Sequence, residues 1–139
     1  MVPHSPMKIL HSKKKVAGFE HKVFSLTDVY WKLDEAAVLD HKFRKALSES
    51  LDQQGMLWPP IVWTQSVFLI YLAESGRRHD PSKSVEVDQG HRVAIGNNRF
   101  HYAQQAGFTH IECVVSPTWQ DRDTILAQTE MEYRKDYGV

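Results

Sequence analysis

The sequence predicts a single α+β domain. Its 139 residues are a usual length for one domain, and 42% of them are hydrophobic, which is enough to form a core. Short apolar runs typical of strands alternate with segments in which apolar residues recur at helical spacing. Because the sequence contains no internal repeat, we expect these elements to share one core.

The N-terminal residues differ in charge from the rest of the chain. Residues 1–22 carry several lysines but only one acidic residue, Glu20, although the whole chain balances 17 basic against 17 acidic side chains. We expect this segment to be a basic, flexible arm that precedes a domain spanning residues 23–139. The arm could touch phosphate groups or could simply be solvated.

The domain is expected to begin with strand-like sequence in Lys22–Trp31, interrupted by a turn. A helix should follow, with Asp34 as its N-cap and Gly55 at its end. Pro59–Trp63 then has the composition of a short buried strand. The apolar face of the helix would carry Leu39, Phe43, Ala46, Leu47 and Leu51.

The middle of the chain gives a mixed signal. Ser66–Ala73 is a continuous apolar run, which favours a strand but leaves a buried helix open. Glu74–Ser84 is polar and contains Pro and Gly, as loops do. Val85–Ile95 resembles a hairpin, because apolar and polar residues alternate on either side of a Gly-containing turn.

A glycine follows this predicted hairpin and marks a sharp corner. Gly96 should end the strand, a helix should run to about Ala106, and Gly107 stands where a left-handed helix terminator belongs. His110–Val115 is predicted to be a strand that buries Cys113, and a final helix should begin near Asp121.

The corner residues suggest a phosphate site. A strand that turns through glycine into a helix exposes free backbone N–H groups, and these attract anions together with the helix dipole. Asn97 and Asn98 can donate amide hydrogens, Arg99 can bind phosphate oxygens with two N–H groups, and His101 lies one turn further on. The alternative is an ordinary tight turn at Gly96, with Arg99 on the surface or paired with a carboxylate.

Three segments resemble the ParB N-terminal and sulfiredoxin-like family in order and spacing. The segment AIGNNRFHYAQQAGFTHIECVV, residues 94–115, is similar to the family's Gly-x-x-Arg box with its helix and following strand. ALSESLDQQGMLWPPIVW, residues 46–63, is similar to the upstream helix and Pro-Ile-x-Val strand. EMEYR, residues 130–134, matches a Glu-Asn-x-x-Arg motif less well, because Met131 replaces the asparagine.

This resemblance implies a compact domain with a small mixed sheet, flanking helices and a nucleoside triphosphate bound at Gly96–Arg99. Glu130 would hold Mg²⁺, although Met131 cannot replace the lost oxygen ligand. Sulfinic acid reduction is not expected, because Asn97 and Asn98 stand where sulfiredoxins carry a cysteine. Relatives of this fold also transfer phosphate, for which Asp34 or Glu35 could serve as the catalytic base.

Two other function classes stay open. A DNA-associated module or nuclease would use the basic arm and Arg77–Arg78 to bind the backbone. A non-catalytic protein-interaction module, from a mobile element such as a phage or plasmid, would need the corner only for structure. A homodimer is also left open.

The remaining sequence features bear on metal sites and on the compartment. Eight histidines, including His91 and His101 beside the corner, include no pair with helical zinc-site spacing, so no transition metal is expected. A single cysteine, the lack of a signal peptide and the lack of a membrane-length apolar run predict a cytoplasmic protein without membrane contact.

Overall fold

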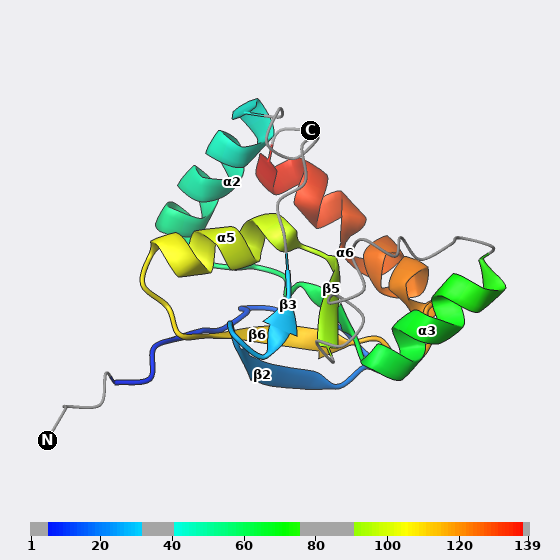
Figure 1. The fold of residues 1–139 in the computed structure, drawn as a ribbon. Helices are drawn as coiled ribbons and strands as arrows, with labels where there is room; N and C mark the ends of the chain where they lie inside the picture. The colour runs from blue at the N-terminus through cyan, green and yellow to red at the C-terminus, as the bar shows by residue number, and fades with distance from the viewer. Residues whose placement is uncertain (1–5, 32–40, 76–90, 138–139) are drawn as a thin grey trace, which may run out of the picture.

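The computed structural model describes residues 6–31, 41–75 and 91–137, and for residues 41–44 and 130–137 it describes the backbone only. These parts form a mixed sheet flanked by four helices, which confirms the predicted α+β class (Figure 1). None of the described helices is long and apolar enough to cross a membrane.

The strand β6 (His110–Val115) organises one half of the sheet. Strand β2 (His21–Ser25) runs antiparallel along one edge of it. On the other edge, β1 (Ile9–Leu10) pairs in parallel with its first residues, and β4 (Ile61–Trp63) pairs in parallel with its last. Strand β6 therefore pairs with three strands that lie far from it in the chain.

The other half of the sheet leads to the corner. Strand β5 (His91–Ile95) is antiparallel to β4 and parallel to β3 (Val29–Tyr30). Because Ile61 is in register with Ile95, the residue before β4 lies beside the residue after β5. The first strand of the predicted hairpin lies outside the described residues.

The helices mostly follow the sequence predictions. Helix α2 (His41–Gln54) ends at Gly55, whose φ is +77°, and α6 begins at the predicted residue and spans Asp121–Tyr137. Helix α5 (Asn97–Gln105) lies over β6, and α2 packs above α5 (Figure 1). The proposed N-cap Asp34 and most of the predicted loop Glu74–Ser84 lie outside the described residues.

The preference for a strand in Ser66–Ala73 is wrong, because this run belongs to helix α3 (Gln65–Glu74). A continuous apolar run has no periodicity that separates the two structures, so the flanking residues decide. Thr64 has extended backbone angles, and its hydroxyl accepts a hydrogen bond from the Val67 N–H at 3.4 Å. This N-cap starts a helix directly after β4.

The described part of the expected N-terminal arm packs onto the domain. Besides forming β1, it runs beside the segment after α2, where the Lys13 and Lys14 N–H groups donate to the Met56 and Leu57 carbonyls at 2.8 and 2.9 Å. Val16 is 3% exposed. The prediction of a flexible arm rested on the many lysines of this segment. A count of charges does not register the few apolar residues, such as Val16, that anchor the segment to the domain.

The core lies on both faces of β6. Ile111 and Cys113 are fully buried on one face, in a cluster that includes Phe100 of α5. Val114 points to the other face, where it packs with Val16 and Ile125. The predicted burial of Cys113 is confirmed, and its alternation with Val114 follows from the two-residue period of a strand.

Candidate functional site

The predicted strand–glycine–helix corner is present. Strand β5 ends at Ile95, Gly96 is the N-cap of α5, and its carbonyl accepts hydrogen bonds from the N–H groups of Arg99 and Phe100 at 3.0 and 3.4 Å. The helix ends at Gln105, Gly107 follows with a φ of +84°, and the Phe108 N–H donates to the Ala103 carbonyl at 2.9 Å. This is the capping geometry that the sequence predicted.

The glycine at the corner is required by packing as well as by conformation. Gly96 has a φ of +112°, a region that side chains rarely adopt. A Cβ at this position would lie 2.7 Å from the Cβ of Pro60 and 3.3 Å from Nη1 of Arg99. The backbone at Gly96 therefore packs directly against Pro60, the residue before β4.

Arg99 lies inside the domain, with only 5% of its surface exposed. Its charge acts on Cys113: burial raises the pKa of that thiol, and the nearby guanidinium partly opposes the increase. Arg99 is thus not the surface residue that the tight-turn alternative assumed. Its positive charge instead lies inside the domain, close to Gly96 and to Cys113.

A groove lies between α2 and α5, with a volume of about 420 Å³. Two predicted site residues, Asn98 and His101, line it together with Lys45 and Ser48 of α2. Gly96, Asn97 and Arg99 are not on its walls. The other lining residues are Leu47, Tyr102 and Gln105.

The polar side chains on the α5 wall of the groove are more constrained than the lysine on the α2 wall. Within the described part of the chain, the buried Oδ1 of Asn98 has no hydrogen-bond partner. The imidazole of His101 meets Trp31 edge-on, with ring centroids 6.5 Å apart. The amide and the imidazole are held in place by the helix that carries them, whereas Lys45 on the opposite wall is 79% exposed and can adjust.

A hydrogen bond between described side chains joins the two helices that form the groove. The Tyr102 hydroxyl of α5 donates to Oδ1 of Asp52 in α2 at 2.7 Å. Burial, together with the hydrogen bond to Asp52 and the charge of that carboxylate, raises the pKa of Tyr102 to about 12. The contact fixes the spacing of the two groove walls.

Other predicted site residues are not placed by the structure. Asp34 and Glu35 lie outside the described residues, and Glu130 belongs to α6 at a position where only the backbone is described. His91 packs against Phe24 with ring centroids 5.0 Å apart, whereas His101 contacts Trp31. Among the described residues, no group of three or more His, Cys, Asp or Glu side chains could hold a metal ion.

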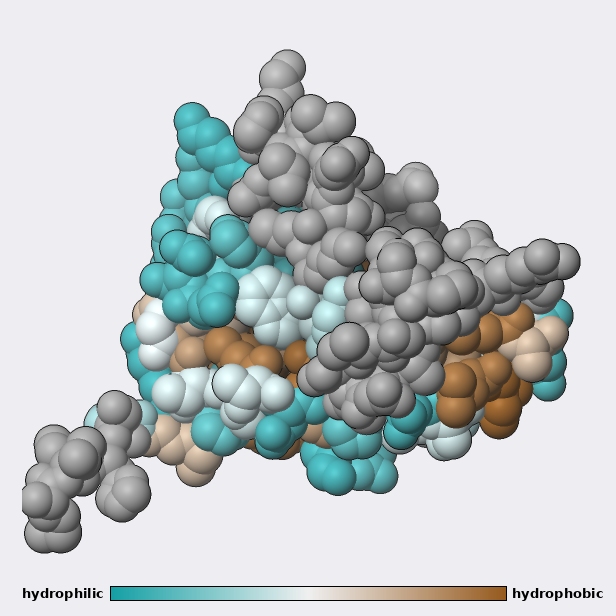
Figure 2. Space-filling model, in the orientation of Figure 1, coloured by the Kyte–Doolittle hydropathy of each residue, from teal (hydrophilic) through white to brown (hydrophobic). Residues whose placement is uncertain are grey.

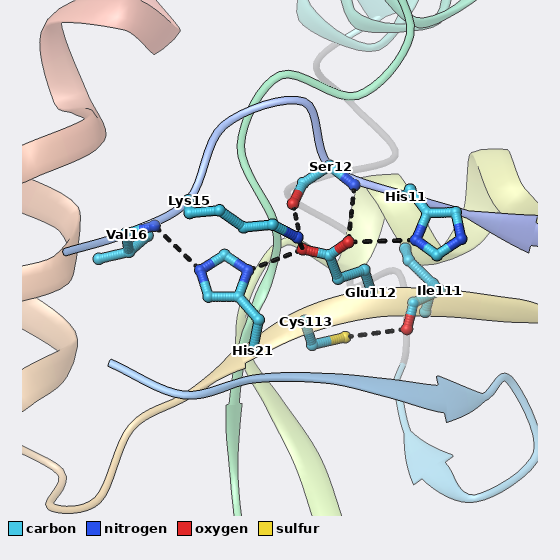
Figure 3. Close-up of polar contacts among 8 residues, drawn as sticks. All are labelled: His11, Ser12, Lys15, Val16, His21, Ile111, Glu112 and Cys113. Atoms are coloured by element: carbon cyan, nitrogen blue, oxygen red, sulfur yellow. Dashed lines mark hydrogen bonds and ion pairs between the residues drawn. The ribbon is translucent and has the colours of Figure 1, made fainter. Parts of the chain in front are cut away.

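The sequence predictions missed a buried carboxylate, Glu112, in the centre of β6 (Figure 3). Its side chain accepts hydrogen bonds from Ser12 Oγ at 2.6 Å and from the Nζ of Lys15. His21 Nδ1 lies 2.8 Å and His11 Nδ1 3.2 Å from its oxygens. Burial raises the pKa of Glu112, but these four partners outweigh it and lower the pKa to about 2.

The tautomer of His21 follows from its two partners (Figure 3). The Val16 N–H donates to Nε2 at 2.9 Å, so Nε2 carries the lone pair and Nδ1 carries the proton that Glu112 accepts. Carboxylates orient catalytic histidines in the same way, but here the backbone of Val16 occupies the basic nitrogen. The pair therefore holds the N-terminal segment to β6. Its one sequence signal was a charge in the middle of a predicted buried strand.

Comparison with models of protein families found no match, and a search of curated proteins found no significant match either.

Proposed function

We propose that this chain binds a nucleotide or another phosphorylated ligand in the groove between α2 and α5. The observation that carries the proposal is the shared cavity of Asn98 and His101 with Lys45 and Ser48. Helices α2 and α5, which lie far apart in the sequence, therefore both contribute to one concave surface.

The chemistry of these groups suits a phosphate. Lys45 supplies a positive charge, Ser48 a hydroxyl donor, and the Asn98 side chain an amide. The ion pair between Lys45 and Glu49 spans 4.0 Å on the exposed surface, so it competes weakly with a ligand. The N-terminus of α5 and the buried charge of Arg99 add positive potential at one end of the groove.

The order β5–Gly96–α5–Gly107–β6 also agrees with the expected ParB and sulfiredoxin-like arrangement. That family membership remains part of the proposal, because it rests on the motifs alone. Nucleotide hydrolysis or phosphoryl transfer would be a further step. It would require Mg²⁺ at Glu130 and a base at Asp34 or Glu35.

Calorimetric titration tests the proposal. ATP, CTP, GTP, UTP and inorganic phosphate, each with and without Mg²⁺, are titrated into wild type, Lys45→Ala and Asn98→Ala. Lys22→Ala is the matched control, because Lys22 is exposed on β2 and lies over the ring of Phe24. We expect saturable binding to wild type and to the control. In both groove variants the affinity should weaken at least about tenfold, because each loses one or two charge-assisted hydrogen bonds to the ligand.

Two results would point elsewhere. If no phosphate compound binds the folded protein, the proposal is wrong. Binding of duplex DNA with a steep salt dependence and no dependence on Lys45 would favour the DNA-associated alternative. The variant Arg99→Ala is less informative, because it removes a buried side chain and can unfold the corner.

A further inference from the structure

Helix α3 exposes an unusual amount of apolar surface. None of its residues is buried, and Leu69 and Ile70 are 44% and 49% exposed. The hydrophobic patch at the right of Figure 2 coincides with α3 in Figure 1. No charged residue occurs from Gln65 to Ala73. Exposed apolar surface of this kind indicates a contact with another molecule.

The inner side of α3 already has partners. Tyr71 packs against Trp63 with ring centroids 4.9 Å apart, and the guanidinium of Arg92 lies 3.8 Å from the ring centroid of Phe68. The exposed positions form one outward stripe that consists of Ser66, Leu69, Ile70 and Ala73. Because these residues are spaced three to four apart, they lie on one helical face.

The outward stripe is symmetric about the midpoint between Leu69 and Ile70. Small residues, Ser66 and Ala73, stand at equal distances on either side of two large ones. A two-fold interface requires a surface that is complementary to itself. We propose that the outward stripe pairs with the same stripe of a second copy of this chain, with the two α3 helices antiparallel.

The absence of charge on the outward stripe is compatible with this partner. Two charge-free stripes bring no like charges together, and antiparallel helices place opposite ends of their dipoles side by side. Glu74, at the C-terminal end of α3, lies outside the stripe, and its carboxylate accepts a hydrogen bond from Trp119 Nε1 at 2.6 Å within the same chain. A helix that binds a membrane surface typically carries Lys or Arg, and α3 carries neither.

The pairing is expected to be weak. Helix α3 has 10 residues and is therefore only about 15 Å long. Stable complexes bury about 800 Å² on each partner, which one such helix does not supply. We therefore expect a dissociation constant on the order of 100 µM rather than a permanent dimer.

Sedimentation velocity of the full chain measures this association. The protein concentration should run from about 10 µM to about 1 mM, which is roughly tenfold below and tenfold above the expected dissociation constant. Wild type should approach twice the monomer mass at the upper end, whereas Ile70→Glu should remain a monomer. Met7→Glu is the matched control, because Met7 is 63% exposed outside α3, and it should associate as wild type does. A wild type that is monomeric throughout, or an Ile70→Glu variant that associates equally, would overturn the proposal.

Disulfide trapping tests the antiparallel register. Across the proposed axis, position 70 and its symmetry mate are separated along the helix by about 1.5 Å, and position 66 and its mate by about 10 Å. Under an added thiol oxidant, Ile70→Cys should form a linked dimer and Ser66→Cys should not. The native Cys113 is fully buried and does not interfere. Equal linking of both variants would contradict this register.

A membrane is the competing occupant and has its own result. Wild type and Ile70→Glu are sedimented with vesicles of phosphatidylcholine and phosphatidylglycerol. Binding that depends on Ile70 in a protein that stays monomeric would assign the outward stripe to a lipid surface and overturn self-pairing.

Discussion

The Cβ of Pro60 lies 2.7 Å from the point that a Cβ on Gly96 would occupy. Pro60 precedes β4 and Gly96 follows β5, so this contact joins two neighbouring antiparallel strands at the edge where α5 begins. The glycine of the candidate phosphate corner thus has a structural role of its own. Its effect on stability can be measured without a ligand.

Gly96→Ala should destabilise the fold by about 3 kcal/mol. Part of this loss comes from the positive φ and part from the clash with Pro60, each of which costs roughly 1–3 kcal/mol. Gly107→Ala is the control, because Gly107 also has a positive φ but nothing lies within 4 Å of its added Cβ. Urea unfolding should give a loss of about 1 kcal/mol for the control. Equal losses would mean that the Pro60 contact is unimportant.

Glu112→Gln should lower the free energy of unfolding by about 2–3 kcal/mol. The variant removes a buried charge that accepts hydrogen bonds from Ser12 and Lys15, and its amide hydrogens face donors such as His21 Nδ1. The exposed Glu20 provides a control, because Glu20→Gln should change the unfolding free energy by less than about 0.5 kcal/mol. A Glu112→Gln variant as stable as this control would show that the cluster does not hold the N-terminal segment.

The contribution of Glu112 should also depend on pH. Its pKa is about 2 in the folded protein, against an ordinary value of 4.5. A lowered pKa means that the stabilisation is complete above pH 4.5 and is lost as the pH falls from there through 2. The difference in unfolding free energy between wild type and Glu112→Gln should therefore shrink over this range. A difference that stays constant with pH would contradict the lowered pKa.

Asp52→Asn should lower the pKa of Tyr102 from about 12 part of the way toward 10. The charge of Asp52 disappears, whereas burial, the largest cause of the shift, remains. Absorbance at about 295 nm follows phenolate formation between pH 9 and 13, a range that brackets the ordinary tyrosine pKa. Glu49→Gln, on the same helix, should leave the titration unchanged. If Asp52→Asn also leaves the tyrosine titration unchanged, Tyr102 does not form the hydrogen bond with Asp52 in solution.

The corner could be predicted from sequence because its signals are local. Gly96 and Gly107 bracket the helix, and both have the left-handed backbone that only glycine adopts readily. The boundaries of α5, β6 and the start of α6 follow from such short patterns. The Gly96–Pro60 contact has no local signal, because it depends on the register of β4 with β5.

Long-range contacts account for most of what the sequence did not reveal. Ser12 and Lys15 gain their role only when they reach Glu112, about a hundred residues away in the chain. The groove likewise needs Lys45 and Ser48 to meet Asn98, and spacing along the chain carries no information about that meeting. Ser66–Ala73 differs from the predicted strand for another reason, because a helix that is apolar on all sides has no amphipathic period that would identify it.

The proposed ligand of the groove between α2 and α5 is a phosphorylated molecule. A titration of the ¹⁵N-labelled chain with each nucleoside triphosphate, followed by amide chemical shifts, tests it most directly. We expect saturable shifts centred on Lys45, Ser48, Asn98 and His101, and their loss in Lys45→Ala. Spectra unchanged by every nucleotide, or shifts confined to residues far from α2 and α5, would contradict it.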